Sequence, residues 1–172
     1  MARSWRIALA CPALLVAAGC NDGSKAPPPA GSELSPWSHM PTFAWTVLRD
    51  ADTIELAALD PESEPTGDTD PYGGWKVLGR HDASSPERRR AVAAAVARGV
   101  EKGDGSIGKC FHPRHGLKVH DESLGDAELV ICFACASMRV SDYGGIRWVG
   151  IEPDTRDDLD AVFEAEGLTI AP

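Results

Sequence analysis

The sequence has no excess of basic residues and no apolar run long enough to cross a membrane. It contains 17 Lys and Arg against 26 Asp and Glu, a formal net charge of −9. Nucleic-acid binding and electrostatic adsorption to anionic lipid both need basic patches, so this composition argues against both. The apolar stretch from Ile7 to Ala18 is shorter than the roughly 20 residues that a membrane-spanning helix needs. Internal repeats are also absent.

The N-terminus has the organisation of a secretory signal. Arg3 and Arg6 precede the apolar stretch, and the small residues Ala17-Ala18-Gly19 lead to Cys20. This arrangement resembles the lipobox of bacterial lipoproteins, although Ala17 stands where that motif usually has Leu. The resemblance implies cleavage before Cys20, diacylation of its thiol and acylation of its new amino group. Several acyl chains together anchor a protein firmly to a bilayer. An ordinary secretory peptide with a cysteine at the cleavage point by chance is the alternative.

These signals predict three parts. Residues 1–19 are the leader, residues 20–40 are the lipidated cysteine and a flexible tether rich in Pro, Gly and Ser, and residues 41–172 are one globular domain. We expect the domain to face the periplasm or the exterior, held to the bilayer through Cys20. Because the leader holds two arginines and no acidic residue, its removal would make the chain more acidic.

The domain is predicted to be an α+β sandwich, with a mostly antiparallel sheet and two main helices packed on one face. One helix is expected at 86–101, where Ser84 or Ser85 can cap the start and Glu87 completes a capping box with Ser84. The other is expected at 155–166, with Thr155 and Asp158 at capping-box spacing. Strands are predicted at 53–59, 75–78, 107–120, 127–141 and 146–151, and 43–48 reads as a strand or a short helix.

Three cysteines of the predicted domain, Cys110, Cys132 and Cys135, form a cluster in the sequence with His112 and His115. If segments 107–120 and 127–141 pair as a hairpin, residue 110 lies near residues 135–137. Cys110 could then form a disulfide with Cys135, or with Cys132 in another register. Such a bond would add roughly 3 kcal/mol of stability by restricting the unfolded chain.

Two other hypotheses use the same residues. Cys110, His115, Cys132 and Cys135 have ligand types suited to tetrahedral zinc. In a regular strand, however, Cys132 and Cys135 point to opposite faces, so both could bind one ion only if a turn or bulge intervenes. The Cys132–Cys135 pair could also perform thiol redox chemistry, but burial in an apolar strand would raise the thiol pKa and leave it inert.

Three motifs resemble those of a scattered set of small bacterial proteins, with the patterns G-W-x-V-L-G, C-F-x-P-R-H-G and I-C-F-x-C. They are Gly74-Trp75-Lys76-Val77-Leu78-Gly79, Cys110-Phe111-His112-Pro113-Arg114-His115-Gly116 and Ile131-Cys132-Phe133-Ala134-Cys135. Ala134 stands where that set has Glu. The resemblance covers residues 42–172 and implies a shared domain rather than a function.

The sequence thus leads to two hypotheses of different classes. The first is a non-enzymatic envelope lipoprotein without a cofactor, whose domain binds a protein or small-molecule ligand while the cysteine cluster stabilises the strands. The second is a zinc- or thiol-dependent envelope protein or enzyme that uses Cys110, His112, His115, Cys132 and Cys135. The state of the thiols distinguishes them: bridged, bound to metal or free.

Overall fold

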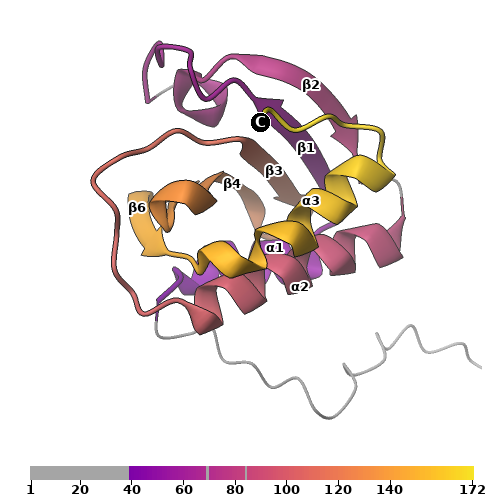
Figure 1. The fold of residues 1–172 in the computed structure, drawn as a ribbon. Coiled ribbons are helices and arrows are strands. Elements are labelled where there is room, and N and C mark those ends of the chain that lie inside the picture. The colour runs from indigo at the N-terminus through magenta and orange to yellow at the C-terminus, as the bar shows by residue number, and fades with distance from the viewer. Residues whose placement is uncertain (1–38, 69, 84) are drawn as a thin grey trace, which may run out of the picture. The chain divides into compact units, whose positions relative to one another are not determined.

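The computed structural model describes residues 39–68, 70–83 and 85–172 (Figure 1). By its internal contacts the chain divides into two units, Met1–Ser32 and Glu33–Pro172. The predicted leader, Cys20 and the tether up to residue 38 lie outside the described residues. Within the described ranges, no helix is both long and apolar enough to cross a bilayer.

The described residues contain one six-stranded sheet in the order β2-β1-β3-β4-β5-β6. Every neighbouring pair is antiparallel. The predicted α+β class with an antiparallel sheet is therefore confirmed. The strands are β1 Thr53–Leu59, β2 Val77–Asp82, β3 His115–Asp121, β4 Gly125–Cys132, β5 Ser137–Asp142 and β6 Gly145–Gly150.

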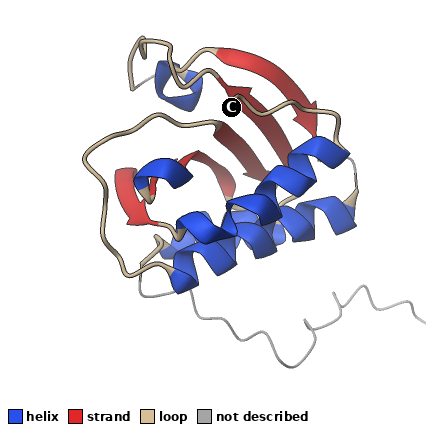
Figure 2. Ribbon diagram, in the orientation of Figure 1, coloured by secondary structure: helices blue, strands red, loops and turns tan. Residues whose placement is uncertain are grey.

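Three helices, α1 Thr42–Asp50, α2 Pro86–Lys102 and α3 Arg156–Ala165, lie together against the sheet (Figure 2). The apolar residues of these helices form one core with alternate residues of the strands. We call the side of the sheet that carries those strand residues the inner face. This arrangement adds α1 to the two predicted helices, because the ambiguous segment 43–48 is helical and buries Ala44, Trp45, Val47 and Leu48. Helical spacing of apolar residues explains that burial.

The start of one predicted helix agrees with the sequence, since Ser85 was one of the two expected caps of α2, and the start of the other differs. The cap of α2 is Ser85, whose side chain accepts a hydrogen bond from the Arg88 N–H at 3.2 Å, and residue 84 lies outside the described residues. At the start of α3 the Thr155 hydroxyl instead donates to the Glu152 carbonyl at 2.7 Å. The predicted Thr155–Asp158 capping box is therefore wrong, because a short 3-10 turn over Pro153–Thr155 precedes the helix and engages that hydroxyl.

Two predicted long strands are shorter than expected. Only His115–Asp121 of segment 107–120 is a strand, and residues 107–114 form a loop that crosses from α2 to β3. Segment 127–141 is divided into β4 and β5 by a 3-10 turn, Phe133–Cys135, and by Ala136, whose φ of 48° is left-handed. Because the chain reverses here, β4 and β5 pair antiparallel, where the sequence had predicted one continuous strand.

The other face of the sheet, which we call the outer face, is partly covered by residues 60–76, the segment that connects β1 to β2. A second, smaller apolar cluster forms there from Ala57, Leu59, Tyr72 and Val130, with Trp75, Val77 and Phe111 packed against it. The helices and this segment thus cover opposite faces of the sheet.

Candidate functional site

Two of the three clustered cysteines are joined to each other. Cys110, in the loop before β3, forms a disulfide with Cys135, at the end of the 3-10 turn after β4, and the two Cα atoms are 5.7 Å apart. The Gly108 N–H donates to the Cys135 carbonyl at 3.1 Å and to the Ser137 hydroxyl at 2.9 Å, which holds the loop close to the same turn. The predicted disulfide is therefore present in the Cys110–Cys135 pairing rather than with Cys132.

Cys132 is a free, buried thiol. Burial raises its pKa, although the backbone N–H groups of His112 and Cys135 oppose the shift. The His112 N–H lies 3.4 Å from the sulfur. A buried thiol with a raised pKa is a poor nucleophile at neutral pH.

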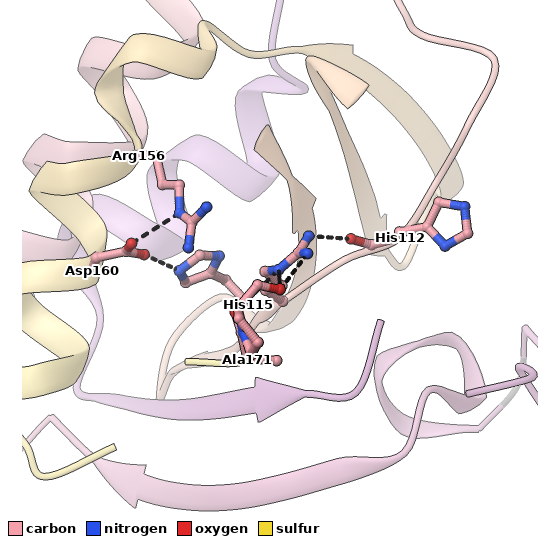
Figure 3. Close-up of polar contacts among 7 residues, drawn as sticks. His112, His115, Arg156, Asp160 and Ala171 are labelled. Carbon is pink, nitrogen blue, oxygen red and sulfur yellow. Dashed lines mark hydrogen bonds and ion pairs between the residues drawn. The ribbon is translucent and has the colours of Figure 1, made fainter. Parts of the chain in front are cut away.

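His115 is buried on the inner face, at the start of β3, and is held by α3. Its Nε2 lies 2.6 Å from one Asp160 oxygen, and the Arg156 Nε donates to the other oxygen at 2.9 Å (Figure 3). The edges of the Phe133 and Phe163 rings meet the imidazole at centroid distances of 5.4 and 5.0 Å. The His115–Asp160 pair therefore joins strand β3 to helix α3, with two phenylalanine rings packed against the imidazole.

The charge states of this pair follow from its surroundings. Burial lowers the pKa of His115 despite the hydrogen bond to Asp160, so its ring is neutral at pH 7 and donates from Nε2. Partial burial of Asp160 opposes its ionisation, but the hydrogen bond from His115 and the charge of Arg156 outweigh it and lower the pKa of that carboxyl. A neutral imidazole beside a carboxylate is the usual state of an orienting contact.

Acidification should destabilise the domain through His115. Because its pKa in the folded chain lies below the value of about 6.5 expected when unfolded, the unfolded chain binds a proton that the folded chain does not. The free energy of unfolding should therefore fall as the pH decreases from about 6.5 toward the folded pKa, by at most about 1.4 kcal/mol per pH unit for this one group. Urea unfolding at pH 7.5 to 5 measures the slope.

The variant His115→Gln should be less stable throughout but should lose this part of the slope. The matched control His39→Gln, at an exposed position, should keep it. An unchanged slope in His115→Gln would assign the acid sensitivity to other groups.

His112 and Arg114, the other basic residues close to His115 in the sequence, make separate contacts. The His112 ring is directed away from His115 in Figure 3, and its Nδ1 lies 3.1 Å from the Pro61 carbonyl oxygen. The Arg114 Nε donates to the main-chain oxygens of Ala171 and Pro172 at 3.1 and 3.0 Å. The cavity lined by His112, Arg114, His115, Phe133, Ala134 and Arg156 has a volume of only about 10 Å³.

The proposed zinc ligands are likewise not gathered in one place. Cys110 and Cys135 are bridged, and the Nε2 of His115 is bonded to Asp160. In the part of the chain that the structure describes, no group of three or more His, Cys, Asp and Glu side chains is placed to hold a metal ion. A zinc site that uses Cys110 and Cys135 would need the disulfide to open, and His115 would have to bind through Nδ1 while Asp160 holds Nε2.

A larger hollow, of about 180 Å³, lies on the outer face beside the segment 60–76. It is polar and carries both signs of charge, and its lining residues are Thr53, Glu55, Pro71, Arg80, Asp82, Lys118 and His120. No motif in the sequence marks these residues. Their only signal was the period-two placement of polar residues on strands, as at Lys118 and His120, which is equally typical of any solvated sheet face.

A buried polar network adjoins this hollow and holds the segment 60–76 on the sheet. The Tyr72 hydroxyl donates to Glu55 at 2.6 Å and its N–H donates to Glu128 at 2.8 Å. Arg139, whose side chain is only 5% exposed, donates to Glu128 at 3.3 Å and to the Asp68 carbonyl at 2.9 Å. Burial and the neighbouring Glu55 raise the pKa of Tyr72 strongly, so it remains a donor.

Comparisons with known proteins do not identify the domain. No protein-family model matches the chain, and neither a curated protein nor a solved structure shows significant similarity to it.

Proposed function

We propose that this chain is a cell-envelope lipoprotein, anchored through acylated Cys20, whose domain binds a protein or small-molecule partner and catalyses no reaction. The Cys110–Cys135 disulfide supports placement outside the cytoplasm, because disulfides persist in oxidising compartments. The leader and Cys20 lie outside the described residues, so the anchor rests on the sequence signal.

One observation supports the proposal that the domain is not catalytic. Each candidate catalytic group is already bonded or buried in the fold. Cys110 and Cys135 bridge the loop to the sheet, the Cys132 thiol is buried, and His115 is bonded to Asp160. A Cys–His catalytic pair needs a thiol of lowered pKa beside an available imidazole. Here the pKa of Cys132 is raised instead.

The three sequence motifs also fall at structural contacts. Phe111 packs edge-on between Trp75 and Trp148, at centroid distances of 6.3 and 4.8 Å. A Cβ at Gly116 would lie 2.4 Å from the Tyr72 ring, and one at Gly74 would lie 2.5 Å from the Thr66 nitrogen. These roles support the interpretation of the motifs as the mark of a shared domain rather than of a catalytic centre. The polar hollow beside Pro71 is a place where a small ligand could bind.

The test is to express the full chain, with its leader, in a bacterium fed an alkyne analogue of palmitate. The wild type should carry the label, Cys20→Ser should not, and the control Cys132→Ser should. After purification without chelator and denaturation, the wild type should have one alkylatable thiol, that of Cys132.

Two results would contradict the proposal. An unlabelled wild type would remove the lipid anchor. A native mass about 63 Da higher, lost on denaturation together with the appearance of three alkylatable thiols, would favour the zinc-dependent alternative at Cys110, His112, His115, Cys132 and Cys135.

A further inference from the structure

The two edges of the sheet are protected unequally against pairing with another strand. Edge strands are commonly guarded by charged residues. On β2, one exposed apolar residue, Leu78, is followed by a charged end with Arg80, His81 and Asp82. On β6, by contrast, Ile146 and Trp148 are 38% and 46% exposed, and Arg147 is the one charged residue of the strand.

The backbone groups of Ile146 and Trp148 point away from the sheet. Asp142 and Gly145 flank a two-residue turn, and in such a hairpin the flanking pair is hydrogen-bonded and bonded pairs then alternate along the ladder. Gly145, Arg147 and Val149 therefore bond to β5, while Ile146 and Trp148 direct their N–H and C=O groups outward. The Arg147 guanidinium donates to the Ile146 carbonyl at 3.1 Å, as an outward carbonyl allows.

The side chains of the same two residues continue an apolar surface. Both lie on the outer face, where Trp148 pairs in register with Arg139 and Ile146 with Ser141. The Trp148 ring meets Phe111 edge-on at 4.8 Å, and Phe111 in turn meets Trp75. The exposed Trp148 ring beside outward backbone groups provides the specificity and the hydrogen bonds of strand addition, once the Arg147 guanidinium leaves the Ile146 carbonyl.

We propose that β6 binds an extended segment of a partner protein as a seventh strand, with an acidic residue opposite Arg147 and apolar residues opposite Ile146 and Trp148. Arg147 favours an acidic residue at the facing position of the partner segment, because opposite charges at directly facing positions stabilise a strand pair. This inference specifies the partner of the proposed binding domain and rests on that role, but it does not depend on the lipid anchor.

A second copy of the chain fits this edge poorly. A two-fold antiparallel pairing centred on Arg147 places two arginines directly opposite each other, and like charges there are destabilising. A pairing centred on Trp148 needs Gly150, but the segment 103–106 covers that residue: a Cβ at Gly150 would lie 2.7 Å from the Ser106 oxygen. A bilayer is also disfavoured, because unpaired backbone groups are costly in hydrocarbon.

The test uses the mature chain, residues 20–172, with Cys20→Ser, and two capped probe peptides, Ser-Thr-Val-Asp-Val-Thr-Ser and the same peptide with Lys in place of Asp. Binding is followed by tryptophan fluorescence. The Asp peptide should bind about fivefold more tightly than the Lys peptide, since one facing charge pair contributes up to about 1 kcal/mol. The variant Arg147→Glu should reverse this preference.

A backbone variant tests the geometry itself. Ile146→Pro removes an outward N–H that β5 does not use, so the fold should persist, as proline is tolerated at such edge positions. Binding of the Asp peptide should weaken at least about tenfold, through the lost hydrogen bond and the clash of the ring with the added strand. The control Leu78→Ser, which changes an exposed apolar residue on the other edge, should bind as the wild type does.

Several results would overturn the proposal. They are failure of both peptides to bind, equal binding of the two peptides by the wild type and by Arg147→Glu, and unchanged binding by Ile146→Pro. Concentration-dependent dimerisation that Ile146→Pro abolishes would assign the edge to a second copy. Partition into neutral phosphatidylcholine vesicles would assign it to the membrane. None of these outcomes alters the palmitate labelling or the thiol count, so the two proposals fail separately.

Discussion

Replacing Gly116 with alanine should lower the free energy of unfolding by about 2–3 kcal/mol, because the outer face has no room for a methyl group at that position. A Cβ there would lie 2.4 Å from Cδ1 and 2.7 Å from Cε1 of the Tyr72 ring. The ring cannot shift cheaply, since hydrogen bonds to Glu55 and Glu128 hold the residue at its hydroxyl and at its N–H. Urea unfolding followed by circular dichroism measures the loss.

A matched glycine and a double-mutant cycle isolate the cause. At Gly79 a Cβ would meet only the flexible end of Leu168, at 3.1 Å, so Gly79→Ala should change stability by less than about 1 kcal/mol. In a Tyr72→Ala background, Gly116→Ala should be nearly neutral, because the clashing ring is gone. An equal loss in both backgrounds would show that the conformation of Gly116, and not its contact with Tyr72, determines the effect.

The contact also explains why the segment 60–76 stays on the sheet. Tyr72 has a φ of 58°, a left-handed conformation that a bulky residue adopts at a cost of about 1–2 kcal/mol. Its ring packs over Gly116, and its polar groups are bonded to Glu55 and Glu128. We infer that these contacts together offset the backbone strain. Weakening them should also open the polar hollow, which Pro71 borders.

The parts of the fold that were predictable depend on local periodicity. Val92, Val96 and Val100 recur every four residues, and all three are buried in α2. Helix α3 likewise buries the apolar residues that share one of its faces, Leu159, Val162 and Phe163. The alternation in segment 53–59 likewise predicted β1 with the bounds that the structure has.

The break between β4 and β5 was not predictable from the same kind of pattern. Residues Leu129 to Phe133 are all buried, so no polar residue marks the end of β4. The reversal occurs at Ala136, a residue type that seldom adopts a positive φ. It is held by the disulfide at Cys135 and by the hydrogen bond from Gly108, both of which join distant parts of the chain.

The surroundings of the candidate site depend on contacts of the same long-range kind. His115 was singled out from its neighbours in sequence, but its partner Asp160 lies 45 residues away on α3. Arg139 and Glu128 are only 11 residues apart, but they meet because the unpredicted reversal at Ala136 pairs β4 with β5. Residue types alone left a structural disulfide, a zinc site and thiol chemistry open, and the long-range partners favour the structural interpretation.

Removing the disulfide should have an effect of similar size to that of Gly116→Ala. The double variant Cys110→Ser/Cys135→Ser should lose about 3 kcal/mol of stability, since the bond closes a loop of 25 residues and restricts the unfolded chain. Both cysteines are replaced together so that neither thiol is left to pair with Cys132. Urea unfolding of the variant and of the wild type, each with and without reductant, measures the difference.

Reductant should destabilise the wild type and leave the double variant unchanged. The control Cys132→Ala keeps the bridge, so it should respond to reductant as the wild type does, with only a small loss from its buried side chain. A response to reductant that disappears in Cys132→Ala would mean that Cys132, and not only Cys110 and Cys135, takes part in the bond. The pairing also bears on β6, because the loop that Cys110 anchors contains Ser106, which covers Gly150. A reduced chain should therefore expose one more residue of that edge, and the Asp probe peptide should bind it at least as tightly as it binds the oxidised chain.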